Sequence, residues 1–432
     1  MIDKTREIAL KVLYDIDKNG AYSNIALDQA LKQARKASEE IEQRDIGFIS
    51  EIVYGTISWR LTIDEVIKKY SNMKMKKISP WILNILRMSI YQILFLDKVP
   101  KSAAVNEGVE LAKRYGHKAS SNFVNAILRK VDKKDYEAFF EIKDDIERIS
   151  KTNSMPTWII EELLKQNAIE KVEQICQASN LKPKLYIRIN TLRTDKQTLI
   201  KEFEKEGIKV KDEGTEDFLL IEGAKNIESL KAFQEGKFTI QDKAAGLIPR
   251  ILNPKPNEKV LDSCSSPGGK TTYMAELMGN HGKIKAWDLH EHRVRLVDKA
   301  ADRLGITIIE TEVKDATKYE EKYCEYFDKI LLDVPCLGIG VLKRKPDIKW
   351  KRKKEDIKEI VKIQEEILEN CSKYLKKGGE LVYSTCSILG EENEEIIHKF
   401  ITNHEKFEIE KKLQIYQNET TDGFFICKMQ KK

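Results

Sequence analysis

Apolar residues in the first 140 positions recur at the spacing of α-helices. They fall three or four positions apart within residues 8–16, 25–37, 44–70, 78–96, 100–112 and 123–131. This spacing gathers apolar side chains on one helical face, and the stretch 78–96, apolar on most faces, is typical of a central buried helix. Gly20 supplies a stop after the first helix. We therefore predict an all-α domain over residues 1–140.

The pattern changes over residues 141–240. Alternating apolar positions predict short strands at 185–189 and 218–221, and helical spacing predicts helices at 158–164 and 195–207. Strands and helices mixed in this way indicate a small α+β module, whose topology the pattern does not fix.

Strands and helices alternate regularly over residues 241–432. Strands are predicted at 259–264, 283–287, 306–313, 327–332, 379–384 and 424–429, with helices beginning at 270 and covering 290–304, 356–375 and 391–400. Because parallel strands are joined by helical crossovers, this alternation predicts a mostly parallel, doubly wound α/β sheet of the Rossmann-like kind. In such a sheet, ligands bind beyond the carboxyl ends of the strands.

Composition indicates a globular protein of two to four domains. The 432 residues are 41% hydrophobic and 34% charged, which excludes wholesale disorder. The most apolar stretch, 81–96, contains polar residues and is too short for a membrane span, and the N-terminus carries charges where a signal peptide needs an apolar core. We expect a cytoplasmic protein with no membrane partner. Seven cysteines, no two spaced C-x2–4-C, indicate reduced thiols and no metal site.

One segment is strongly basic. The net charge of +6 is weak evidence for a nucleic-acid partner, but residues 343–354 hold eight basic residues in twelve, with a tryptophan among them. This segment fits either a solvated loop or a phosphate-binding stripe with an aromatic platform for a base. On the second interpretation, the RNA contacts come from Arg344, Lys349, Trp350, Lys351 and Arg352.

An acid or a thiol follows each of five predicted strands. These residues are Asp262 with Cys264, Asp288, Asp315, Asp333 and Cys386. One such residue is a common cap or turn. Five in register are hard to explain structurally, so they indicate a ligand site at this edge of the sheet.

The loop after the first of these strands contains two glycines. Its residues are Cys264, Ser265, Ser266, Pro267, Gly268, Gly269 and Lys270. A P-loop needs a glycine where Cys264 stands, and the spacing G-x-G-x-x-G is missing, so an ATPase or a NAD enzyme is disfavoured. A glycine turn lets the backbone approach a ligand closely. With Asp288 suited to ribose hydroxyls and Asp315 to an adenine amino group, these residues describe an adenosyl ligand without a pyrophosphate.

Two thiols leave neighbouring predicted strands, in Asp333-Val-Pro-Cys336 and Ser384-Thr-Cys386. This combination fits methylation of cytosine at C5, a poor nucleophile until a thiolate adds to C6. An acid near N3 favours that addition, and Asp333 provides one. From the residues alone, Cys336 and Cys386 are equivalent candidates for the nucleophile.

These blocks closely resemble those of the RNA cytosine-C5 methyltransferases. The resemblance covers nearly the whole chain: residues 262–271 look like the family's cofactor loop, 329–336 with 344–350 like its second catalytic block, 384–387 with 391–393 like its nucleophile block, and 423–425 like its terminal strand motif. Residues 44–45, 53–55, 91–92 and 125–129 resemble the NusB-like domain of members that act on bacterial small-subunit ribosomal RNA. The chain differs from the residues usual in the family at Ser265-Ser266, Leu337 and Cys427. None of these three differences removes a chemical group that the reaction requires.

The resemblance implies a NusB-like RNA-binding domain over residues 1–140, a small RNA-binding or linker module over 141–240, and a Rossmann-like class I methyltransferase domain over 241–432. It implies that Cys386 is the nucleophile, that Cys336 assists product release, and that residues 264–270, Asp288, Asp315 and Asp333 contact the cofactor or the base. The implied cofactor is S-adenosyl-L-methionine, and the implied substrate is an unpaired cytosine of 16S ribosomal RNA. We expect a monomer without metal; the sequence does not identify the target cytosine.

Two other functions explain part of the pattern. A DNA cytosine-C5 methyltransferase would use Cys336 as its nucleophile, but the chain has no obvious DNA-recognition insertion and Cys386 would have no role. A non-enzymatic RNA-binding or antitermination module would explain the helical N-terminus but not the five strand-end residues. Methyl transfer to stripped ribosomal RNA, compared with duplex DNA, distinguishes these functions.

Overall fold

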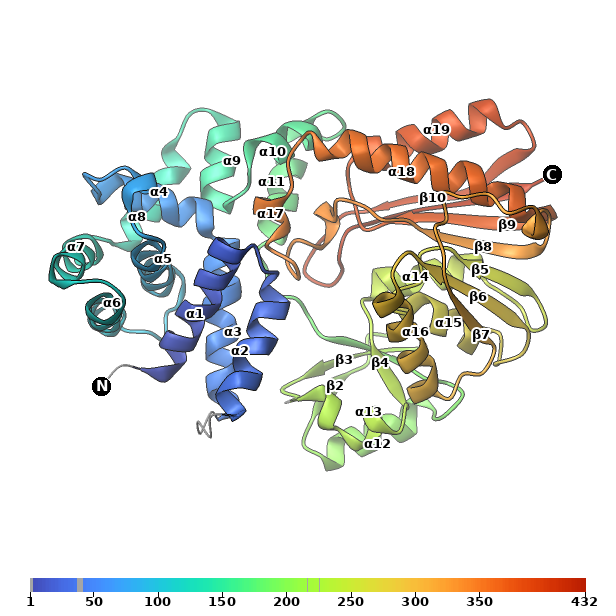
Figure 1. The fold of residues 1–432 in the computed structure, drawn as a ribbon, viewed down its shortest axis with the longest axis horizontal. Helices are drawn as coiled ribbons and strands as arrows, with labels where there is room; N and C mark the ends of the chain where they lie inside the picture. Colours follow the sequence, from blue (N-terminus) through green and yellow to red (C-terminus); the bar gives the residue numbers. More distant parts are fainter. Residues whose placement is uncertain (1–2, 37–41, 216, 225) are drawn as a thin grey trace. The chain divides into compact units, whose positions relative to one another are not determined.

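The computed structural model describes residues 3–36, 42–215, 217–224 and 226–432 (Figure 1). The end of the helix predicted at 25–37 lies outside these residues. The chain divides into two compact units. Unit 1 comprises Met1–Asn180 with Leu342–Lys351, and unit 2 comprises Leu181–Val341 with Arg352–Lys432.

Unit 1 is a helical bundle built around α5 (Pro80–Phe95). The other helices are α1 (Lys4–Asn19), α2 (Ser23–Lys36), α3 (Gln43–Ser58), α4 (Arg60–Tyr70), α6 (Lys101–Tyr115), α7 (Lys118–Leu128), α8 (Lys133–Glu137), α9 (Asp145–Asn153), α10 (Thr157–Leu164), α11 (Ile169–Ala178) and the late α17 (Ile348–Lys351). Helix α5 contacts α1, α3, α4, α6 and α7, and most of its residues are buried. The predicted all-α N-terminal domain with a buried central helix is therefore confirmed.

Unit 2 begins with a small antiparallel sheet in the order β2-β3-β1-β4. Its strands are β1 (Tyr186–Ile189), β2 (Lys209–Lys211), β3 (Phe218–Glu222) and β4 (Phe238–Ile240), with helices α12 (Lys196–Lys205) and α13 (Lys231–Gln234). Ile187, Phe203 and Phe238 form the centre of its apolar core. An α+β module is thus present. The module boundaries at 140 and 240 stay a prediction, and by packing α9–α11 belong to unit 1.

The second sheet of unit 2 has seven strands in the order β10-β11-β9-β8-β5-β6-β7. Strands β5 (Lys259–Asp262), β6 (Lys283–Asp288), β7 (Ile309–Val313), β8 (Phe327–Asp333) and β9 (Leu375–Thr385) are parallel, whereas β10 (Phe407–Ile415) and β11 (Phe424–Lys431) are antiparallel to their neighbours. Helices α18 (Asp356–Cys371) and α19 (Glu394–Asn403) cover one face, and α14 (Lys243–Leu252), α15 (Gly269–Leu277) and α16 (Glu291–Leu304) cover the other (Figure 1). The predicted doubly wound sheet is confirmed.

Strand β10 is the element of this sheet that the sequence pattern did not predict. Its sequence, FEIEKKLQI, mixes charged and apolar residues, and most of its side chains are exposed because it lies at the edge of the sheet. Edge strands often carry such charges, which hide the alternation expected of a half-buried strand.

None of the helices in the described ranges is long and apolar enough to cross a membrane.

Candidate active site

The carboxyl ends of the parallel strands bring the predicted site residues to one edge of the sheet. In the strand register, Asp262 at the end of β5 pairs with Ala286 of β6 and with Leu331 of β8. Asp333 at the end of β8 pairs with Ser384 of β9, two residues before Cys386. The acids and thiols predicted from the sequence therefore follow adjacent strands, in the place where open α/β sheets bind ligands.

The glycine loop runs from β5 into α15 and is tied to β6. Both the backbone N–H and the hydroxyl of Ser265 donate to the carbonyl of Trp287, at 2.8 and 2.9 Å. Gly268 has φ +101°, a conformation that side chains disfavour, and a Cβ there would meet the backbone of Val297 at 3.2 Å. A Cβ at Gly269 would meet only the amide of Gln241, at 3.7 Å. The turn leaves backbone of Gly269 open to a close ligand.

Asp262 lies beneath this loop with one oxygen unpaired. The hydroxyl of Thr271 donates to its Oδ2 at 2.7 Å, whereas the buried Oδ1 has no hydrogen-bond partner. Burial raises the pKa of Asp262 to about 7, against the hydrogen bond from Thr271. A buried, unpaired carboxyl oxygen is costly, so this atom is suited to a polar group of a ligand.

Arg188 is hydrogen-bonded to the glycine loop through the carbonyl of Gly269. The sequence analysis did not predict this residue as part of the site. It lies on β1, fully buried, and its guanidinium binds both carboxylate oxygens of Glu276 at 2.7 and 3.0 Å. It also donates to the carbonyl of Gly269 at 2.6 Å and to the hydroxyl of Thr272 at 3.1 Å. One side chain thus ties the small sheet to the first turn of α15. An arginine within the apolar run LYIRIN was the signal available in the sequence.

Lys270 connects the glycine loop to the end of β8. Its ammonium donates to Asp333 Oδ2 at 2.6 Å, and the hydroxyl of Ser384 donates to Asp333 Oδ1 at 2.9 Å. Burial lowers the pKa of Lys270, but the charges of Asp333, Cys386 and Asp262 raise it, and the net pKa lies above the ordinary value. A positive charge is therefore held beside Asp333 and close enough to Cys386 to interact with it.

The two thiols meet directly. The Sγ atoms of Cys336 and Cys386 are 2.7 Å apart, and the backbone N–H of Cys386 donates to Cys336 Sγ at 3.2 Å. The hydrogen bond with Cys386, and then burial, raise the pKa of Cys336 well above its ordinary value, and the charges of Glu392 and Asp333 add to the rise. Cys336 is therefore a protonated thiol near neutral pH.

The remaining acids lie towards the β6 and β7 side. Asp288 is almost fully buried, with its Oδ2 3.5 Å from Arg293. Asp315 accepts hydrogen bonds from the N–H and hydroxyl of Thr317 through Oδ1, at 3.0 and 2.7 Å. Leu289, directly after Asp288, exposes 57% of its surface and offers an apolar face at the same edge. It was not predicted, because a single leucine carries no pattern.

The basic segment 343–354 is for the most part anchored by contacts within unit 1. Lys349 is only 1% exposed, and its ammonium donates to the carbonyl of Ser58 and to Asn180 Oδ1, at 3.2 and 2.6 Å. The indole of Trp350 donates to the carbonyl of Ile57 at 2.8 Å. The ammonium of Lys351 donates to the carbonyls of Gly20 and Ala21, each at 2.8 Å.

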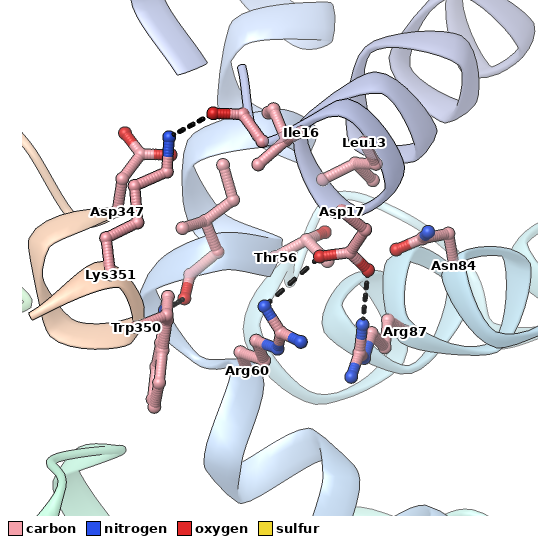
Figure 2. A pocket seen from close by; sticks show the side chains of 12 residues that line it. Leu13, Ile16, Asp17, Thr56, Arg60, Asn84, Arg87, Asp347, Trp350 and Lys351 are labelled. Carbon is pink, nitrogen blue, oxygen red and sulfur yellow. Dashed lines mark hydrogen bonds and ion pairs between the residues drawn. The ribbon is translucent and has the colours of Figure 1, made fainter. Parts of the chain in front are cut away.

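These contacts do not fit the interpretation of the segment as a solvated loop at Lys349, Trp350 and Lys351. Figure 2 shows Trp350 and Lys351 beside a cavity of about 210 Å³, where Asp17 of α1 pairs with Arg60 of α4 at 3.1 Å and Arg87 of α5 at 2.6 Å. A buried lysine whose donors are occupied is an anchor for the segment. RNA contact stays a prediction for all five residues, of which Lys349 is buried and Arg344, Trp350, Lys351 and Arg352 are half-buried.

The burial of Lys349 gives a pH-dependent stability. Burial lowers the pKa of Lys349 from 10.5 to about 7, so between these values the unfolded chain binds one proton more than the folded one. Compared with Lys349→Met, the wild-type free energy of unfolding should rise by about 1.4 kcal/mol per pH unit above pH 7 and stay constant below pH 6. Tryptophan fluorescence in urea measures this, because four of the five tryptophans lie in unit 1.

The exposed Lys345 provides the control, since Lys345→Met should leave no such trend. A wild-type-minus-K349M difference that stays flat from pH 6 to 9 would show that Lys349 remains charged in the folded protein.

Among the residues that the structure describes, no three His, Cys, Asp or Glu side chains are grouped as metal ligands.

Comparison with known families matches the chain along its length. The NusB family matches residues 3–133, a ferredoxin-like domain of RsmF/B-like methyltransferases matches residues 155–228, and "16S rRNA methyltransferase RsmB/F" matches residues 249–430. A Bacillus subtilis protein named "Probable ribosomal RNA small subunit methyltransferase B" is 40% identical, covering 99% of this chain and 98% of its own. The chain belongs to the ribosomal RNA small subunit methyltransferase B family. The resemblance to methyltransferases that act on bacterial small-subunit ribosomal RNA, drawn from the sequence motifs, is thereby confirmed.

A further relative and two solved structures are also similar to this chain over most of its length. The Proteus mirabilis "Ribosomal RNA small subunit methyltransferase B" is 31% identical over 99% of this chain and 98% of its own. The crystal structure of the protein PH0851 is 29% identical and covers 98% of each chain with a TM-score of 0.81. A methyltransferase homologue from Pyrococcus horikoshii is 30% identical and covers 67% of this chain and all of its own, with a TM-score of 0.59. In this family member, the expected NusB-like domain, small module and Rossmann-like methyltransferase domain are all present.

Proposed function

We propose that this protein transfers a methyl group from S-adenosyl-L-methionine to C5 of a cytosine in 16S ribosomal RNA, through a covalent bond between Cys386 and C6. The contact of the two thiols beside the Lys270–Asp333 ion pair carries this proposal. Cytosine-C5 methylation needs a thiolate for C6, an acid near N3 and a group that assists release of the thiol. These three groups follow the adjacent strands β8 and β9.

The cofactor side of the site fits an adenosyl ligand. The open backbone at Gly269 allows close approach, and the unpaired Asp262 Oδ1 provides a buried acceptor. Asp288 would bind the ribose hydroxyls, Asp315 the adenine amino group, and the exposed Leu289 the face of the adenine ring. When bound, S-adenosylmethionine supplies an electrophilic methyl group. Residues 264–270 would hold it, with Lys270 keeping Asp333 in place.

In the proposed reaction, the thiolate of Cys386 adds to C6 while Asp333 stabilises the protonated N3, which makes C5 nucleophilic. After C5 is methylated, a water molecule from solvent takes the C5 proton, and the electron pair of that C–H bond re-forms the C5–C6 double bond. The C6–S bond breaks at the same time, and Cys386 leaves as a thiolate. Cys336 assists this release. The assignment of attack to Cys386 and of release to Cys336 is what the family resemblance implies, since either sulfur can be the donor in their contact.

The substrate is tested by bisulfite sequencing of 16S ribosomal RNA from cells that lack the protein. One cytosine should lose its methyl group and regain it when the wild-type gene is returned. In vitro, the purified protein should methylate stripped 16S ribosomal RNA at least about 100-fold faster than duplex DNA, because the target base must be unstacked. Equal rates on duplex DNA, or an unchanged bisulfite pattern, would contradict the proposal.

A further inference from the structure

Glu392 lies behind the two thiols and contacts the residue that follows each of them. Its Oε2 accepts the backbone N–H of Leu337, next to Cys336, at 2.9 Å. Its Oε1 accepts the hydroxyl of Ser387, next to Cys386. The Glu392 side chain is fully buried. One carboxylate therefore bridges the two loops that carry the thiols.

A glutamine on α18 completes this bridge. The amide Nε2 of Gln364 donates to Glu392 Oε2 at 3.0 Å and to the carbonyl of Pro335, just before Cys336, at 2.9 Å. Gln364 is also fully buried. Together the two side chains contact the residues on both sides of Cys336 without contacting its thiol.

The loops also approach each other closely at Gly340. Its N–H donates to the carbonyl of Cys386 at 2.9 Å, and a Cβ at this position would lie 2.8 Å from the same oxygen. This backbone contact fixes the approach of the loops from one side. The Glu392 carboxylate joins the same loops through side-chain hydrogen bonds, in addition to the contact of the two thiols.

We propose that Glu392 is a positioning residue that sets the separation of the Cys336 and Cys386 thiols, so that one can attack the base and the other can assist its release. This inference rests on the proposed function. The reaction needs both thiols beside one C5–C6 bond, and an error of about 1 Å in such a site can lower the rate about 100-fold. Glu392 itself need not touch the base.

The charge of Glu392 also affects the pKa of the Cys336 thiol. Burial raises the pKa of Glu392, while hydrogen bonds from Ser387, Leu337 and Gln364 and the charge of Arg352 oppose the rise. The charge of Glu392 in turn contributes to the raised pKa of Cys336. A carboxylate at this position therefore helps to keep Cys336 protonated.

Comparing Glu392→Ala with Glu392→Gln separates the effect of the hydrogen bonds made by Glu392 from the effect of its charge. Glutamine has the same shape, and its carbonyl can accept from Leu337 and Gln364 while its amide donates to Ser387. We expect Glu392→Ala to lower kcat on 16S ribosomal RNA about 100-fold, with KM for RNA and Kd for S-adenosylmethionine changed less than about threefold. Glu392→Gln should recover most of this loss. It should also shift the pH profile of Cys336 alkylation by iodoacetamide to lower pH, because the neighbouring charge is gone.

The fraction of RNA bound covalently to the protein distinguishes a positioning role of Glu392 from a purely structural one, because a structural role would leave this fraction unchanged. In a single turnover, Glu392→Ala should change the fraction of RNA held as a denaturation-resistant adduct relative to methylated product. The exposed Glu395 on α19 provides a matched control, and Glu395→Ala should behave as wild type. If Glu392→Ala does not fold, Ser387→Ala breaks one arm of the bridge and should lower kcat about tenfold without weakening cofactor binding.

Two results separate this inference from the proposed function. A folded Glu392→Ala with wild-type kcat and adduct fraction overturns the role of Glu392, even though methylation and its dependence on Cys386 remain. So does equal loss in Glu392→Ala and Glu392→Gln without an alkylation shift. Loss of the proposed function itself would instead appear as a wild-type protein that does not methylate RNA.

Discussion

Replacing Cys386 with alanine should lower methyl transfer by about 10⁴-fold or more while leaving the affinity for S-adenosylmethionine within about twofold of wild type. Without the thiolate there is no addition to C6, so C5 stays a poor nucleophile, and removal of a covalent nucleophile has effects of this size. Transfer of radioactive methyl groups to 16S ribosomal RNA measures the rate, and isothermal titration measures the affinity. None of the hydrogen bonds described above for Asp262, Asp288 and Asp315 involves Cys386, which follows β9.

Replacing Cys336 provides the matched control. Cys336→Ala should also stop turnover, but it should trap a protein–RNA adduct that survives denaturing electrophoresis, because addition proceeds and release does not. An adduct found with Cys386→Ala instead would reverse the roles of the two thiols. Near-normal turnover by Cys386→Ala would rule out the proposed nucleophile.

Replacing Arg188 with methionine should cause the largest loss of stability among the variants considered. It leaves the buried carboxylate of Glu276 without its partner, and breaking a buried ion pair typically costs about 3–5 kcal/mol. It also removes the hydrogen bond to the carbonyl of Gly269, so cofactor affinity should fall. The buried Cys371 and Cys427 report unfolding of unit 2 through their reaction with a maleimide in increasing urea, read by peptide mass spectrometry.

A compensating change tests the cause. The double replacement Arg188→Met with Glu276→Leu removes both charges, and buried pairs replaced by apolar residues often keep or gain stability. It should regain at least half of the lost free energy of unfolding, but not the lost cofactor affinity. If the single variant unfolds at the wild-type urea concentration, the ion pair does not hold the glycine loop to the small sheet.

The fold was predictable where apolar spacing is long and regular. The helix around residues 78–96 and the alternating strands and helices after residue 241 were recognised because burial on one or both faces leaves a periodic pattern. Strand β10 was not, because its exposed, charged edge position removes the alternation. The division between the units was also not predictable. Residues 342–351 lie far along the chain from the helices they contact, and no local pattern records such a long-range contact.

The site was predictable only in part, and for a physical reason. The order of parallel strands places strand-end residues at one edge, so Asp262, Asp288, Asp333 and Cys386 could be grouped from sequence position alone. Side chains that act from within the core carry no such positional signal. Arg188 and Glu392 are charged residues in apolar surroundings, and their importance follows from their buried partners. Lys349 is the opposite case. The sequence suggested an exposed lysine that could contact RNA, because a lysine in a basic run gives no sign that it is buried.

The course of the chain limits how this protein can be divided. The backbone passes between the two units three times, after residues 180, 341 and 351. A chimera that exchanged only the first 180 residues would leave Lys349 without the side-chain oxygen of Asn180, and Trp350 without the guanidinium of Arg60, wherever the donor differs at these positions. Ten residues that sit between the Cys336 loop and α18 must therefore be inherited together with the N-terminal helices. Recombination within the family should therefore favour exchanges in which residues 342–351 and the N-terminal helices come from the same parent.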